Sequence, residues 1–71
     1  MWVVYDHPHD FPRNYVARQW VWNEDAKEYV TTPNLMVAPD VEVIRFALTL
    51  RGLVRLERNE GDDPKIMETW L

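Results

Sequence analysis

The chain has 71 residues, no Cys and a net charge of -4, and 46% of its residues are hydrophobic. A chain of this length buries only about 60% of its unfolded surface, so it has room for a single core. The absence of Cys excludes disulfides and thiolate zinc sites as additional supports. We therefore expect one domain over residues 1–71, stabilised by packing or by self-association.

The charge and the hydropathy pattern also restrict the partners. General affinity for nucleic acid relies on clustered Lys and Arg, which an acidic chain does not favour, whereas an acidic surface suits a protein partner with a basic patch. No stretch approaches the ~20 consecutive apolar residues of a membrane helix, and no secretory signal pattern is present. We expect a cytoplasmic protein without a membrane partner.

The first half of the chain has the pattern of strands joined by loops. Residues 1–6 are mostly aromatic and β-branched and run into a loop with two prolines, which is typical of a strand and its end. Residues 15–22 alternate between two faces, and the polar turn at 23–27 separates them from a second strand-like run at 28–32. These runs predict a hairpin, and residues 35–38 continue it after Pro33, either as the same strand or as a separate one.

The second half predicts one helix and a second hairpin. The helix is expected from Asp40, which can accept hydrogen bonds from the first turn, to Arg51, with Gly52 as its stop. Residues 53–58 and 65–71 are two alternating runs around a turn rich in Gly, Asp and Pro. The resulting order is β-β-β-α-β-β, an α+β fold with one antiparallel sheet of about five strands and the helix on one face.

Two features of these elements point to contacts with other chains. The helix carries only a narrow polar stripe of Glu42, Arg45 and Thr49, so its apolar surface covers the sheet or meets a partner. The apolar final strand, Ile66 to Leu71, is expected to present an unpaired edge through which a homodimer can form.

Several classes of chemistry are excluded by composition. The chain contains no Ser and no Cys, which are the commonest nucleophiles for acyl transfer. Its two glycines lie far apart, so they cannot form a glycine-rich loop that cradles phosphates. We expect no enzymatic activity and no cofactor.

The loop Asp6-His7-Pro8-His9-Asp10 is the one pattern that suggests a metal. Histidines two apart on an extended backbone can point the same way, and with one carboxylate they supply a minimal ligand set for zinc or iron. His7, His9 and Asp10 are the candidate ligands, with Asp6 as the alternative carboxylate or as a group that orients an imidazole, and such a site could be hydrolytic. The alternative is that the aspartates only shape the loop by accepting local hydrogen bonds.

The alternation of residues 15–22 places Arg18, Trp20 and Trp22 on one face of a strand. Aromatic side chains beside an Arg can stack single-stranded bases, and the same residue types dominate protein interface hot spots. Tryptophans in so small a chain are also expected in the core. The acidic balance favours a protein over a nucleic acid.

The second hairpin turn, Glu60-Gly61-Asp62-Asp63, is acidic, with Glu57 and Glu68 nearby. Its spacing lacks the alternating ligands and closing Glu of a calcium-binding loop. It can imitate phosphates toward a basic groove, or it can be a solvated turn.

The segments Tyr5-Asp6-His7-Pro8 through Pro12 and Gly61-Asp62-Asp63-Pro64 through Trp70 resemble a group of small uncharacterised proteins from bacterial and phage genomes. The group has no assigned activity, so the resemblance implies no functional residue. It raises the hypothesis of a phage-type viral protein that inhibits a host defence complex, as anti-CRISPR proteins do.

These observations favour a small, acidic, non-enzymatic protein-binding module. Its alternatives are a metal site in the His-Pro-His loop and single-strand nucleic-acid binding through Arg18 with Trp20 and Trp22. The residues predicted to contact a protein partner are Trp20, Trp22, Glu60, Asp62, Asp63 and Trp70.

Overall fold

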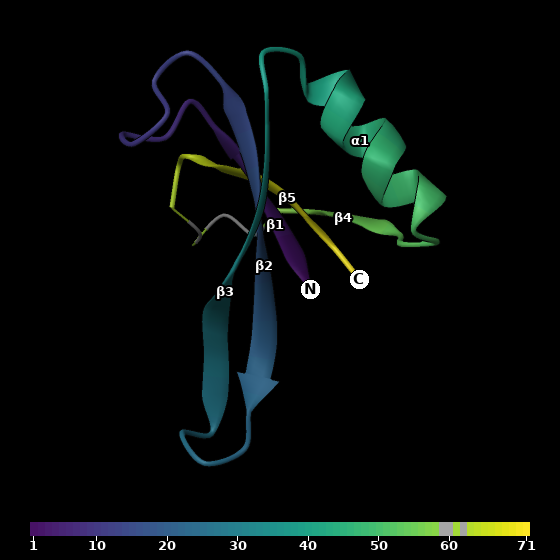
Figure 1. Ribbon diagram of the computed structural model, residues 1–71. Coiled ribbons are helices and arrows are strands. Elements are labelled where there is room, and N and C mark those ends of the chain that lie inside the picture. The colour runs from purple at the N-terminus through teal and green to yellow at the C-terminus, as the bar shows by residue number, and fades with distance from the viewer. Residues whose placement is uncertain (59–60, 62) are drawn as a thin grey trace.

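The residues that the structure describes form five antiparallel strands and one helix, as the computed structural model in Figure 1 shows. The structure describes residues 1–58, 61 and 63–71. The elements are β1 (Trp2–Asp6), β2 (Tyr15–Asn23), β3 (Glu28–Ala38), α1 (Val41–Leu50), β4 (Arg55–Glu57) and β5 (Ile66–Trp70). The sheet order is β3-β2-β1-β5-β4. The predicted α+β class and the order β-β-β-α-β-β are both confirmed.

The core lies between α1 and one face of the sheet. Residues paired across antiparallel strands share a face, and Trp2 pairs with Trp70 on β5. These two indoles, each 5% exposed, pack with the fully buried Leu48 and with Ile44 on the helix. Two tryptophans therefore supply much of the apolar area that this short chain buries.

The helix begins and ends where its capping residues predict. Asp40 Oδ1 accepts a hydrogen bond from the Glu42 amide at 2.9 Å, which satisfies a donor of the first turn. After the last turn Gly52 adopts a φ of +79°, and the Leu53 amide donates to the Leu48 carbonyl at 3.3 Å. This left-handed reversal closes the helix and returns Leu53 to the core.

No helix in the described part of the chain has the length and apolar character needed to span a membrane.

The strand β3 passes through Pro33 as one element, with an irregular pairing opposite Arg18 and Trp20. Pro33 is tolerated because β3 is an edge strand, where a missing amide hydrogen leaves no ladder bond unmade. The Gln19 side chain bridges the irregularity, accepting from Thr32 Oγ1 at 3.1 Å and from Asn34 Nδ2 at 2.9 Å.

The prediction that the final strand forms an unpaired edge is wrong. β5 lies inside the sheet between β1 and β4, so the edges among the described residues are β3 and β4. The reason is burial: β5 carries the buried Glu68 and Trp70, whereas all three residues of β4 are exposed. β5, the more buried of these two strands, thus has a paired strand on each side, whereas β4 stands at the edge.

Candidate functional site

An open groove of about 410 Å³ lies on the sheet face opposite α1. Arg18 pairs with Val3 on this face, while the neighbouring Ala17 points into the helix-side core. We call this hollow the groove. It is lined by Tyr5, Pro8, His9, Asp10, Arg18, Trp20, Thr31, Asp63 and Lys65. It thus joins Trp20 and Asp63, predicted to contact a partner, with His9 and Asp10 from the predicted metal loop.

The loop between β1 and β2 brings Asp10 to the groove. The His7 amide donates to the Asn14 carbonyl at 3.1 Å, and the Phe11 amide donates to the Pro8 carbonyl at 2.9 Å, so the loop contains its own turn. Asp10 then accepts from the Arg18 guanidinium on β2. This ion pair spans the groove wall and fixes the loop against the sheet.

The predicted metal ligands are not assembled into one site. His7 has a φ of +50°, its Nδ1 pairs with Asp6, and its ring contacts Tyr15 edge-on at 4.8 Å between centroids. Asp10 is engaged by Arg18, and exposed His9 lines the groove. In residues 1–58, 61 and 63–71, no three His, Asp or Glu side chains are grouped so that they could hold a metal ion.

The hairpin of β2 and β3 projects beyond the rest of the sheet, as Figure 1 shows, and we call residues 20–31 the arm. Trp22 and Tyr29 lie opposite each other on it, with ring centroids 5.4 Å apart at 74°. Their exposed fractions are 49% and 46%. Trp22 Nε1 donates to Glu24 Oε1 at 3.1 Å, which orients the indole on the arm.

The three tryptophans predicted to contact a partner have different environments. Trp22 is exposed, while Trp20 is partly buried and lines the groove. The Trp20 Nε1 donor is buried and has no hydrogen-bond partner among the described residues, at a cost of about 1–3 kcal/mol. Trp70 is a correction to the predicted surface: its pairing with Trp2 beneath α1 places it in the core.

The acidic turn is described only in part. Glu60 and Asp62 lie outside the described residues. Asp63 is exposed and lines the groove, and its Oδ1 accepts from the Lys65 amide at 2.8 Å. Asp63 therefore shapes the backbone of the turn and also presents a carboxylate to solvent.

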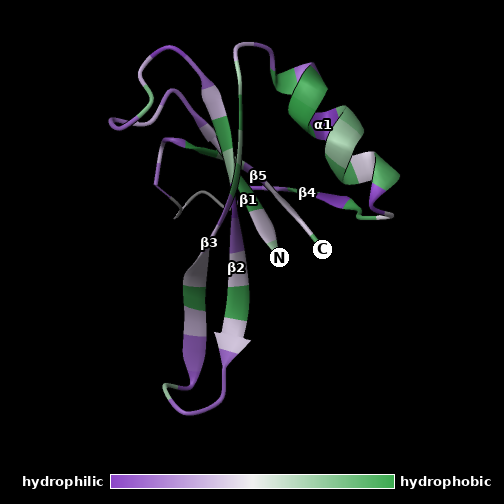
Figure 2. Cartoon of the chain, viewed as in Figure 1, coloured by the Kyte–Doolittle hydropathy of each residue, from purple (hydrophilic) through white to green (hydrophobic). Residues whose placement is uncertain are grey.

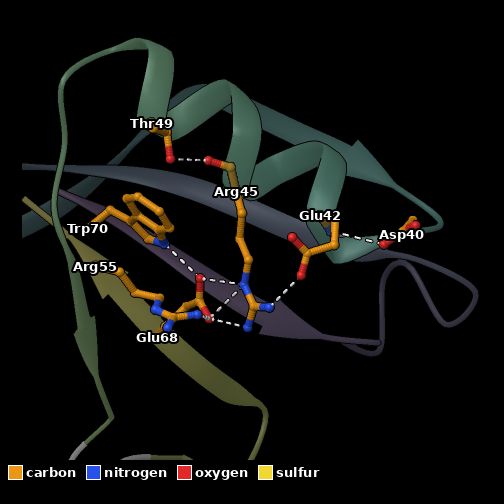
Figure 3. A network of polar contacts seen from close by, with 7 residues as sticks. All are labelled: Asp40, Glu42, Arg45, Thr49, Arg55, Glu68 and Trp70. Carbon is orange, nitrogen blue, oxygen red and sulfur yellow. Dashed lines mark hydrogen bonds and ion pairs between the residues drawn. The ribbon is translucent and has the colours of Figure 1, made fainter.

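Glu68 is the one buried charged side chain among the described residues, and Figure 3 shows its polar partners. Its carboxylate accepts from Arg45 Nη2 at 2.7 Å and from Trp70 Nε1 at 2.7 Å, and Arg55 Nη1 lies 4.0 Å away. Burial by itself raises the pKa of Glu68, but hydrogen bonds from Arg45 and Trp70 and the charges of Arg45 and Arg55 outweigh it. The pKa of Glu68 is lowered, so this side chain is a charged structural element.

The surroundings of Glu68 form a second hollow, of about 300 Å³, between α1 and β4. Its lining residues are Arg45, Arg55, Glu57, Arg58, Met67 and Glu68. The carboxylates Glu57 and Glu68, predicted to lie near the acidic turn, are thus placed among arginines. Glu68 is neutralised by its neighbours and is not a ligand for a solvent cation.

Comparison with known proteins leaves the family open: no family model, no curated protein and no solved structure matches the chain. The resemblance to small bacterial and phage proteins therefore stays a prediction.

Sequence reasoning missed Tyr29 as a surface aromatic. The predicted hairpin contained part of the signal: the structure pairs Asn23, inside the predicted turn over residues 23–27, with Glu28, and this register places Tyr29 across from Trp22.

Proposed function

We propose that this chain is a non-enzymatic protein-binding module that engages its partner with the arm and the groove. The observation that carries the proposal is the exposed Trp22–Tyr29 pair at the projecting arm. Trp and Tyr are the residues most enriched at interface hot spots, and their ring packing reduces the entropy lost on binding. The groove next to the arm offers a concave surface with Trp20 on its wall.

The charge of the arm supports a basic partner. Residues 20–31 contain Glu24, Asp25 and Glu28 against Lys27, which gives +1 − 3 = −2. Among these, Glu24 contacts Lys27 Nζ at 3.3 Å and receives the Trp22 indole donor, while Asp25 and Glu28 are exposed. Acidic groups around an aromatic anchor favour association with a basic surface and make its rate sensitive to salt.

The same contacts argue for protein over single-stranded nucleic acid. Arg18, the cation expected to meet a phosphate, is paired with Asp10. The exposed indole of Trp22 is flanked by the acidic turn of the arm, which would repel a phosphate backbone. Stacking of bases on Trp22 would therefore have to overcome an unfavourable local charge.

The resemblance to phage-type proteins suggests the class of partner. A small acidic protein without catalytic apparatus can inhibit a host defence complex by covering a basic surface that normally binds nucleic acid. We therefore propose a nucleic-acid-binding protein of the host as the partner, with anti-CRISPR-like inhibition as the biological outcome.

The test is capture of host proteins on immobilised protein at low and high salt. We expect one basic protein to be retained at low salt and released at high salt, and to be lost from Trp22→Ala and Tyr29→Ala. Phe46→Ala is the matched control, because Phe46 is an aromatic residue on α1 that is 67% exposed and lies off the arm. Equal retention by Trp22→Ala, Tyr29→Ala and Phe46→Ala would remove the arm from the interface.

A further inference from the structure

The edge strand β4 has the features of a surface that pairs with itself. Its inner side pairs with β5, and no strand covers its outer side among the described residues. Its sequence Arg55-Leu56-Glu57 has opposite charges placed symmetrically around a central apolar residue. An exposed strand edge of this kind is a template for another strand.

The backbone pattern shows which groups of β4 face outward. Val54 and Leu71 exchange both hydrogen bonds, with N–O distances of 2.8 and 3.0 Å, so they form a hydrogen-bonded pair. In an antiparallel ladder such pairs alternate with non-bonded pairs. Leu56 therefore also bonds inward to Thr69, and the amide and carbonyl groups of Arg55 and Glu57 point toward the free edge.

An antiparallel second copy matches this edge in both hydrogen bonding and charge. If Leu56 of each copy lies at the two-fold axis, Arg55 of one copy stands opposite Glu57 of the other. Both residues have outward backbone groups, so each pair can exchange two hydrogen bonds. Their side chains also face one another as opposite charges, which stabilises a cross-strand pair.

The side chains near β4 suit the same occupant. Arg55 and Glu57 both line the hollow beside this edge and are both exposed, so each can reach the oppositely charged residue of a second copy. On the other face of the strand, Leu56, Val54 and Leu71 are 45%, 65% and 55% exposed, which provides apolar surface for a contact.

We propose that β4 is the pairing edge of a two-fold homodimer, with Leu56 at the axis and Arg55 of each copy opposite Glu57 of the other. This joins two five-stranded sheets into one and leaves the arm free, since β3 and β4 lie at opposite edges of the sheet. The homodimer does not depend on the proposed partner, and either can fail without the other.

The test is a charge-swap experiment followed by sedimentation velocity over a range of concentrations. In a homodimer of Arg55→Glu, two glutamates stand opposite each other at positions 55 and 57. In a homodimer of Glu57→Arg, two arginines stand opposite each other at the same positions. Each variant alone should therefore dimerise at least about tenfold more weakly than the wild type. A mixture of the two restores both opposite-charge pairs, and a heterodimer of wild-type strength is expected. Arg13→Glu and Glu28→Arg are the matched controls, because both residues are exposed and lie away from β4.

A second variant tests the backbone contact without changing Glu68 or its partners. Glu57→Pro removes an amide hydrogen that faces the free edge, so the chain should fold and be monomeric. Leu56→Pro removes an amide that faces β5 and should lower the stability of the monomer. Three results would each overturn the proposal. The wild-type protein could be monomeric at all concentrations, Arg55→Glu and Glu57→Pro could dimerise as the wild type does, or the mixture of charge-swap variants could stay monomeric.

Discussion

Arg45 on α1 and Glu68 on β5 form an ion pair that joins the helix to the sheet. Arg45 Nη2 lies 2.7 Å from Glu68 Oε1, and Arg45 Nε lies 3.2 Å from both carboxylate oxygens. Arg45 Nη1 also donates to Glu42 at 2.8 Å. The Glu68 side chain is 4% exposed and that of Arg45 is 26% exposed, so the pair crosses from the interior to the surface.

Replacing Arg45 by Met should destabilise the protein by about 2–4 kcal/mol, because among the described residues it leaves the buried carboxylate with Trp70 and the more distant Arg55 alone. The second change Glu68→Gln should recover about 1 kcal/mol or more, since it removes the unpaired charge. Urea denaturation of the two single variants and the double variant measures this coupling. Additive losses in the double variant would show that the pair contributes no interaction of its own.

The free energy of unfolding should fall in acid through Glu68. The pKa of Glu68 is lowered from its ordinary value of 4.5 in the folded protein, so folding favours the charged carboxylate. The stabilisation is complete above the pKa of the unfolded chain and is lost as pH falls through the pKa of the folded state. Denaturation of the wild type should show a decline below about pH 4.5 that is reduced in Glu68→Gln. Identical pH profiles for both proteins would contradict this assignment.

Local sequence signals predicted the elements well because each rests on neighbouring residues. Asp40 and Gly52 mark the helix ends through hydrogen bonds within a few residues. The order of strands in the sheet depends instead on contacts far apart in the chain, such as that of Trp2 with Trp70. Alternation within residues 66–71 could not show that both sides of this strand are paired.

The candidate site was predictable only in part, for the same reason. The alternation of β2 placed Trp20 and Trp22 on one face, but their exposure depends on where the other strands and the loop lie. Hydrophobic residues make up most of α1, as its mostly green colouring in Figure 2 shows, so the sequence alone does not tell which of them are buried. Only the packing reveals that Ile44 and Leu48 face the sheet while Phe46 and Leu50 face solvent.

Gly52→Ala should destabilise the protein by about 1 kcal/mol. The cost comes from its φ of +79°, which disfavours a side chain, and not from crowding, because a Cβ there has nothing within 4 Å. Leu50→Ala is the matched control, since Leu50 lies two residues earlier on α1 and is 72% exposed, and its effect should stay within about 0.5 kcal/mol. Thermal unfolding of both variants checks the difference, and equal melting temperatures would contradict the role of Gly52 as the helix stop.

The two faces of α1 should respond differently to truncation. Leu48 is fully buried in the core cluster, so Leu48→Ala should cost about 2–5 kcal/mol through lost apolar burial and the cavity that remains. Phe46 lies two residues away with 67% of its surface exposed, and Phe46→Ala should change the free energy of unfolding of the monomer by less than about 0.5 kcal/mol. Denaturation at low protein concentration compares the two without a contribution from association. A loss above about 1 kcal/mol for Phe46→Ala would mean that its ring is covered in the folded chain.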